Sequence, residues 1–111
     1  MNMRIWIDDV RPAPEGYVWC RTTNEAKNLI TCIMQMQHIE NTSNLPTIEL
    51  IDIDHDAGDY AKYGGDYIKV LDWLEGQSYH CQWTIRIHSM NSVGRENMRR
   101  IIERNGWKEI A

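Results

Sequence analysis

Hydrophobic and polar residues alternate in several short segments of the chain. Such alternation predicts β-strands, because successive side chains of a strand point to opposite faces of a sheet. Stretches rich in proline or glycine separate some of these segments from their neighbours. The predicted strands are residues 3–8, 17–21, 47–53 and 83–87, with residues 107–110 as a candidate fifth strand.

Other segments carry apolar residues at intervals of three and four, the spacing of a helix with one buried face. Polar capping residues at the start of such a segment and a glycine after its end help to locate the helix. The predicted helices are one that Thr22 or Thr23 caps, one over about residues 66–75, and one that Asn91 or Ser92 caps and Gly106 follows. Residues 57–65, which include three glycines, form a predicted loop.

Strands and helices thus alternate along the chain, which predicts an α/β fold with a mostly parallel sheet, right-handed crossovers and helices on both faces. We expect residues 1–111 to form one such domain, with four to five strands and about three helices. Its core is predicted at the apolar positions that share strand or helical spacing. These positions are Ile5, Ile7, Leu29, Ile33, Ile51, Ile53, Val70, Leu71, Leu74, Ile85, Ile87, Met98, Ile101 and Ile102.

The amino-acid composition of the chain limits the kinds of ligand and partner that it is expected to bind. The chain has 12 Lys and Arg against 16 Asp and Glu, which argues against coating of duplex DNA but leaves room for a small phosphorylated ligand. No apolar run is long enough to span a membrane, and the N-terminus turns acidic too early for a signal peptide, so we expect a cytoplasmic protein.

Three cysteines without a Cys-x-x-Cys pair predict reduced thiols. The aromatic residues are five Trp and five Tyr with no Phe, and their polar atoms suit a solvated site.

Polar side chains follow three of the predicted strands at the points where these strands end. Asp8 and Asp9 follow the first strand, residues 54–56 (Asp-His-Asp) the third, and His88 and Ser89 the fourth. Because ligands of open parallel sheets bind outside the carboxyl ends of the strands, we expect these residues to meet at one rim.

The acidic members of this group suit a divalent cation. Asp8, Asp9 and Asp54 are a candidate ligand set for Mg²⁺ or Mn²⁺, which binds carboxylate oxygens and commonly bridges to phosphate. The alternative is that they are turn and cap residues, where Asp is common. Asp52 shares a strand face with Asp54 and is either a second site carboxylate or a buried partner of a His or Arg. Which of the two is the primary carboxylate of this strand stays open.

The remaining rim residues suit phosphate chemistry. His55 and His88 are candidate acid–base catalysts beside Asp54, although each could merely orient a neighbouring carboxylate. Arg95, near the start of the last helix, is a candidate phosphate ligand. Ser89 and Asn91 are candidates for the same task, with Asn91 also a helix cap.

The acidic pair after the first strand and the Asp after the third resemble the receiver domains of response regulators, in which such residues bind Mg²⁺ and accept a phosphoryl group. Receiver domains also have a Ser or Thr after the fourth strand and a Lys after the fifth. The chain departs from that pattern because His88 precedes Ser89 after the fourth strand, and Lys108 is the only candidate for the lysine. Ordinary aspartyl-phosphate signalling is therefore not predicted.

A closer resemblance covers nearly the whole chain. The matching stretches are WIDDVRP at residues 6–12, IDHD at 53–56, GDY at 65–67 and HSMNSVGRENM at 88–98. They resemble the cyclic-phosphate processing receiver family, a divergent and shortened receiver. The resemblance implies a flavodoxin-like three-layer sandwich that acts on, or senses, cyclic phosphates of RNA ends or nucleotides, in some cases in conflicts between bacteria and phage.

Two functions from different classes follow. The first is a metal-dependent phosphoesterase that processes a cyclic phosphate or small phosphodiester, with Mg²⁺ or Mn²⁺ as cofactor and a nucleotide or RNA end as substrate. The second is a non-catalytic receiver-like module that binds a nucleotide signal or a partner protein through the same rim.

Overall fold

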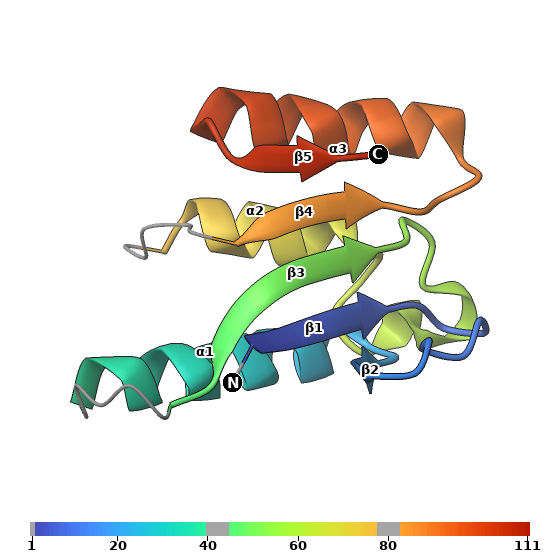
Figure 1. Ribbon diagram of the computed structural model, residues 1–111. Coiled ribbons are helices and arrows are strands. Elements are labelled where there is room, and N and C mark those ends of the chain that lie inside the picture. The colour runs from blue at the N-terminus through green and yellow to red at the C-terminus, as the bar shows by residue number, and fades with distance from the viewer. Residues whose placement is uncertain (1, 40–44, 78–82) are drawn as a thin grey trace.

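The computed structural model describes residues 2–39, 45–77 and 83–111 (Figure 1). All the predicted strands and helices are present, with ends that differ by at most two residues from the prediction. The elements are β1 (Asn2–Ile7), β2 (Tyr17–Cys20), α1 (Thr23–Ile39), β3 (Thr47–Ile53), the short 3₁₀-helix η1 (Gly58–Lys62), α2 (Ile68–Glu75), β4 (Thr84–Ile87), α3 (Ser92–Asn105) and β5 (Lys108–Ile110). The predicted loop of residues 57–65 therefore contains one short helix.

The five strands form one parallel sheet in the order β2-β1-β3-β4-β5. This confirms the α/β receiver-like fold with a parallel sheet. One register shift separates Met3 from Arg4 in the pairing of β1 with β3, so Glu49 is an extra residue on β3 and its carboxylate lies 3.2 Å from the Arg4 guanidinium.

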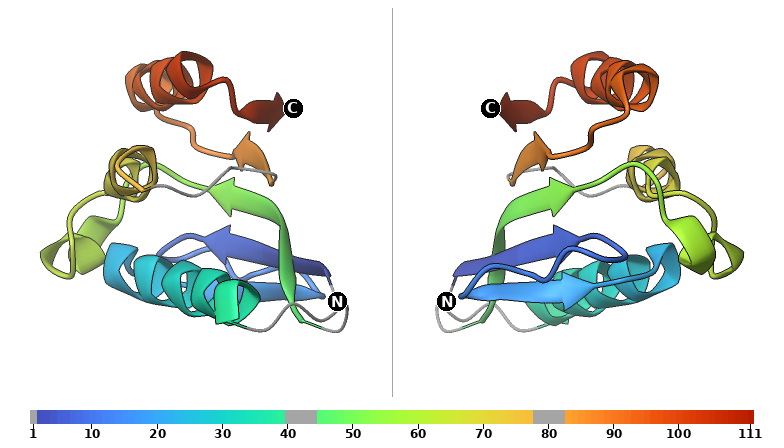
Figure 2. Two further views of the ribbon diagram at one scale, coloured as in Figure 1. Left: turned by 90° about the vertical axis from the view of Figure 1, so that its left-hand side faces the viewer. Right: turned by 90° about the vertical axis from the view of Figure 1, so that its right-hand side faces the viewer.

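The helices differ from the prediction because all three lie on one face of the sheet (Figure 2). The connections β2–α1–β3, β3–α2–β4 and β4–α3–β5 all move in the same direction across the sheet. Right-handed crossovers in one direction place their helices on one face, and α2 accordingly contacts both α1 and α3. The connection from β1 to β2 runs in the opposite direction across the sheet, but it consists of residues 8–16 and contains no helix. The described residues thus form two layers where three were expected.

The core lies between the sheet and this helical layer. Isoleucines at alternate positions of β1, β3 and β4 are buried, as the strand spacing predicts. Leu29 is the predicted core residue that is only partly buried, because Ala26, Ile30 and Ile33 form the inner face of α1. The core also includes residues outside the prediction: Cys20, Ile30, Ile48, Ala57, Tyr67 and Trp83, with Ala26.

Polar caps fix the helix ends where the sequence places them. The Thr22 hydroxyl accepts a hydrogen bond from the Glu25 amide (2.9 Å), and the Asn91 side chain accepts one from the Gly94 amide (2.9 Å). Gly106 ends α3 in the left-handed conformation that favours glycine.

The thiols of Cys20 and Cys32 are free, and burial raises the pKa of Cys20 to about 12. Cys81 lies outside the described residues. None of the described helices has the length and apolar character needed to span a bilayer.

The ends of α2 and α3 are joined by Glu75. Its carboxylate accepts hydrogen bonds from Arg104 (2.7 and 2.8 Å) and Asn105 (2.6 Å), which lower its pKa to about 2. The stability linked to this shift is present above the usual glutamate pKa and is lost as the pH falls through about 4.5 towards 2.

We therefore expect Glu75→Gln to flatten the loss of stability between pH 5 and pH 2.5, roughly the interval between the two pKa values. Urea unfolding at a series of pH values measures this, with Glu15→Gln, in an exposed loop, as the control. An acid dependence as steep as that of the unchanged protein would contradict the assignment.

Candidate functional site

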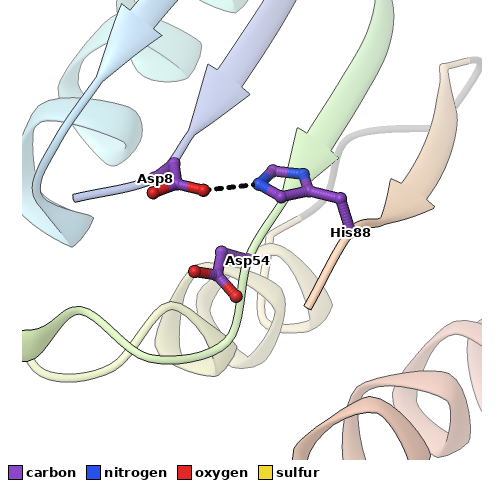
Figure 3. A group of neighbouring side chains, drawn as sticks. All are labelled: Asp8, Asp54 and His88. Carbon is purple, nitrogen blue, oxygen red and sulfur yellow. Dashed lines mark hydrogen bonds and ion pairs between the residues drawn. The ribbon is translucent and has the colours of Figure 1, made fainter. Parts of the chain in front are cut away.

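The carboxyl ends of β1, β3 and β4 bring Asp8, Asp54 and His88 together, although these residues are far apart in the sequence (Figure 3). One potential metal-ligand atom from each of the three lies within 4.8 Å of the other two. The convergence expected from the strand ends is thus present for these three residues.

Asp8 is fully buried and densely hydrogen bonded. Its Oδ1 accepts bonds from the amides of Val10 (3.0 Å) and Arg11 (2.9 Å), and its Oδ2 lies 2.9 Å from His88 Nε2. Burial alone would raise the pKa of Asp8, but these hydrogen bonds and the Arg11 charge together lower it below its usual value. Asp8 is therefore held as a carboxylate.

His88 lies between two buried carboxylates. Its Nδ1 is 2.6 Å from Asp52 Oδ1 and its Nε2 is 2.9 Å from Asp8 Oδ2, and its ring stacks on Trp6 at 3.9 Å with the planes 3° apart. Through these two contacts the His88 ring links the ends of β1, β3 and β4.

Arg11 is a cation at the rim. Its Nε lies 3.0 Å from Asp8 Oδ2 and its Nη2 lies 3.2 Å from Asp54 Oδ2. The guanidinium therefore bridges two of the three carboxylates predicted to hold a metal ion. Its side chain is 45% exposed, whereas Asp8 and Asp54 are buried, so Arg11 is the solvent-accessible member of this group.

Asp9 lies beside this cluster but outside the set of three. Burial, followed by the charges of Asp8 and Asp54, raises the pKa of Asp9. Its Oδ2 would be 2.6 Å from a Cβ at position 58, so Gly58 allows the close approach of η1. The Asp9 carbonyl accepts two hydrogen bonds from Arg21, at 3.0 and 2.8 Å.

The sequence leaves Asp52 as either a second site carboxylate or a buried partner of a His or Arg, and the geometry matches the second of these roles. Its Oδ1 faces His88, and its Oδ2, which lacks a hydrogen bond, lies 3.8 Å from the Arg86 guanidinium. Asp54 is the strand-end carboxylate that faces Arg11, and its Oδ1 accepts a bond from the His55 amide (2.8 Å).

His55 belongs to a neighbouring group on the same rim. Its Nδ1 lies 2.8 Å from Asp56 Oδ1, and the Asn91 amide lies 3.3 Å from the same oxygen. Asp66 completes a second set of three possible ligand residues with His55 and Asp56. A Cβ at Gly94 would be 2.5 Å from the imidazole, so the ring packs directly on the first turn of α3.

The predicted phosphate residues lie beside His88. Ser89 is buried, and its hydroxyl accepts a hydrogen bond from the Asn91 amide (3.1 Å), while Arg95 donates to the Ser89 carbonyl (3.1 Å). A cavity of about 560 Å³ opens here, and its lining includes His88, Ser89, Arg95 and Arg86. Asn91 lies outside that lining and caps α3 as expected.

From the sequence, Arg11 is expected only to border the rim, and no role is predicted for Arg86 or Trp6. The signal for Arg11 was its place three residues after Asp8 in a proline-rich turn. The signal for Arg86 was its place two residues before His88, which puts both on one strand face.

The residues at the rim fit a divalent ion in their donor chemistry. Asp8 and Asp54 offer the hard oxygen ligands that Mg²⁺ prefers, and an imidazole beside them also suits Mn²⁺. The raised pKa of Asp9 reflects its burial and the charges of Asp8 and Asp54. An ion bound by Asp8 and Asp54 would take over the charge neutralisation that Arg11 now provides.

A parallel α/β sheet with acidic residues after its first and third strands defines a receiver-like domain. Residues 3–104 match the model of the cyclic-phosphate processing receiver domain. The chain belongs to this family. No curated protein and no solved structure matches the chain significantly.

The packing of His55 on α3 gives a test of the site. Gly→Ala inside a helix normally stabilises by about 0.5–1 kcal/mol, but Gly94→Ala should destabilise because the new methyl group meets the His55 ring. Thermal unfolding measures the effect. In the background of His55→Ala, which removes the ring, Gly94→Ala should stop destabilising; equal destabilisation in both backgrounds would contradict the packing.

Proposed function

We propose that this protein is a metal-dependent phosphoesterase that opens a cyclic phosphate of a nucleotide or RNA end. The observation that carries the proposal is the close set of Asp8, Asp54 and His88 beside a cavity whose lining includes Arg86 and Arg95. His88 belongs both to this set and to the cavity lining, so candidate cation ligands and guanidinium groups that suit a phosphate lie on either side of it.

Asp8 and Asp54 are the proposed ligands of Mg²⁺ or Mn²⁺, with Asp9 nearby to add negative charge. A divalent ion in such a site polarises a phosphoryl oxygen and neutralises developing charge. Arg11, whose side chain is 45% exposed, would leave Asp8 and Asp54 when these residues hold the ion.

The two histidines receive different tasks in this proposal. Both nitrogens of His88 face carboxylates, so His88 fixes the position of Asp8. His55 uses Nδ1 towards Asp56, which leaves Nε2 for proton transfer.

Hydrolysis then proceeds by attack of a water oxygen on phosphorus as one ring P–O bond breaks. His55 takes the proton from the attacking water, and solvent protonates the leaving ribose oxygen. Arg95 holds a non-bridging oxygen of the phosphate.

Hydrolysis of 2′,3′-cyclic and 3′,5′-cyclic nucleotides with Mg²⁺ or Mn²⁺ tests the proposal, with the phosphomonoester product detected by chromatography. His55→Gln should lower kcat by roughly 10²–10⁴-fold without loss of stability. His88→Gln should instead destabilise the fold by about 1–3 kcal/mol, because it leaves buried carboxylates without their partner. No turnover across the panel, with binding retained, would favour the non-catalytic module.

Arg11 gives a test that does not depend on turnover. If its guanidinium competes with the metal, Arg11→Gln should tighten Mn²⁺ binding about tenfold, or about 1.4 kcal/mol. Calorimetric titration measures this, with Arg100→Gln, on the exposed side of α3, as the matched control. Weaker Mn²⁺ binding in Arg11→Gln than in the control would refute the competition.

A further inference from the structure

The face of the sheet opposite the helices carries an unusual set of side chains. Strand register places Tyr17 beside Arg4 in one row, and Trp19, Trp6, Asp52 and Arg86 side by side in the next. Alternation puts both rows on the face opposite the buried isoleucines. We call this surface, defined by Arg4, Trp6, Tyr17, Trp19 and Arg86, the open face, because no described helix covers it.

Two aromatic rings of the open face, those of Trp6 and Tyr17, are in contact. Trp6 meets Tyr17 edge to face at 5.9 Å, and Trp6 also stacks on His88. Trp6, Tyr17 and Trp19 are all partly exposed. The indoles of Trp6 and Trp19 each donate a hydrogen bond to a carbonyl of residues 8–11, at 2.8 Å, so these two also anchor that turn. Tyr17 makes no such bond in the described residues.

Positive charge borders these rings although the whole chain carries a net charge of −4. Arg4 and Arg86 have side chains that are 50% and 47% exposed, and Lys108 is in the same row as Arg4. Glu49 faces Arg4 as an exposed ion pair, which costs little to exchange for another anion. The partner of Arg86, Asp52, is buried and also bonded to His88.

We propose that the open face binds a single strand of RNA and guides its end to the rim. Bases stack on exposed aromatic rings in a sequence-tolerant way, and arginines contact the phosphates, as in other single-strand binding surfaces. Arg86 lies both in the row of Trp6 and in the lining of the cavity beside His88, so the surface is continuous with the site. This substrate class rests on the proposed function, but binding to the face is measurable without turnover.

The test uses a fluorescein-labelled oligouridylate of roughly eight nucleotides, within the usual range of single-strand sites, that ends in a 2′,3′-cyclic phosphate. Binding is followed by anisotropy in EDTA, with uridine 2′,3′-cyclic phosphate and an RNA duplex as competitors. We expect the single strand to bind at least about tenfold more tightly than the mononucleotide, because the mononucleotide offers one base to stack. The duplex should compete poorly since its bases are already stacked.

Tyr17→Ala should weaken oligouridylate binding by about 5- to 100-fold, the range for loss of one stacked base. Tyr63→Ala, which removes an exposed tyrosine of the helical side, is the matched control and should leave binding unchanged. Neither change should alter binding of the cyclic mononucleotide by more than about twofold, a difference below the scale of a stacking contact.

Arg4→Gln is a second variant that leaves the aromatic rings in place. It should lower the slope of log affinity against log salt by about 0.7, the value for one phosphate contact of a single strand. Arg100→Gln is its control. Circular dichroism and thermal unfolding verify that each variant is folded.

Equal affinity for mononucleotide and oligonucleotide, or equal effects of Tyr17→Ala and Tyr63→Ala, would overturn the proposal. A concentration-dependent dimer that Tyr17→Ala abolishes would also overturn it, because a second copy would then occupy the face. Tight oligonucleotide binding that depends on Tyr17, with no hydrolysis in Mn²⁺, would contradict the proposed function and leave the open face supported.

Discussion

The ends of three strands are held together by one imidazole. His88 directly follows β4, Asp8 follows β1, and Asp52 belongs to β3. The two carboxylates are buried and lie against the imidazole ring. Burial of an unpaired carboxylate costs several kcal/mol, so the contact with the imidazole helps to stabilise both acidic residues here. The orientation of Asp8 in turn sets the position of Arg11, and Arg11 sets the charge around Asp54.

The second constraint is the direction in which the chain crosses the sheet. Only the step from β1 to β2 runs against the others, and only a helix in that step would cover the opposite face by a right-handed crossover. Residues 8–16 instead form a turn that the indoles of Trp6 and Trp19 hold through two backbone carbonyls. One topological choice therefore supports Asp8 and its neighbours and leaves the aromatic rings accessible.

The sequence predicts the elements and the parallel sheet, because alternation and helical spacing report burial along each segment. It also predicts that Asp8, Asp54 and His88 converge, since the carboxyl ends of parallel strands share a rim. It does not reveal the layer of each helix, which depends on the order of strands across the sheet. Nor does it show that His88 faces two carboxylates or that Arg11 bridges Asp8 and Asp54. Those contacts depend on side-chain rotamers, which hydrophobic spacing does not report.

The side chains at the rim divide into fixed and exchangeable ones. His88 is nearly buried and bonded at both nitrogens, so its replacement by an incoming cation would disrupt the strand ends. Arg11 is half exposed and makes only ion pairs and one carbonyl contact, so it can leave while the fold persists. Burial, and after it the charges of Asp8 and Asp54, raise the pKa of Asp9, and these same charges favour a divalent ion in the place of Arg11. A phosphate that approaches Arg95 through the cavity would meet the rim without displacing His88 from its carboxylates. In the proposed function, a divalent cation thus replaces Arg11 and a phosphate enters beside Arg95 while the imidazole keeps its contacts with the strand ends.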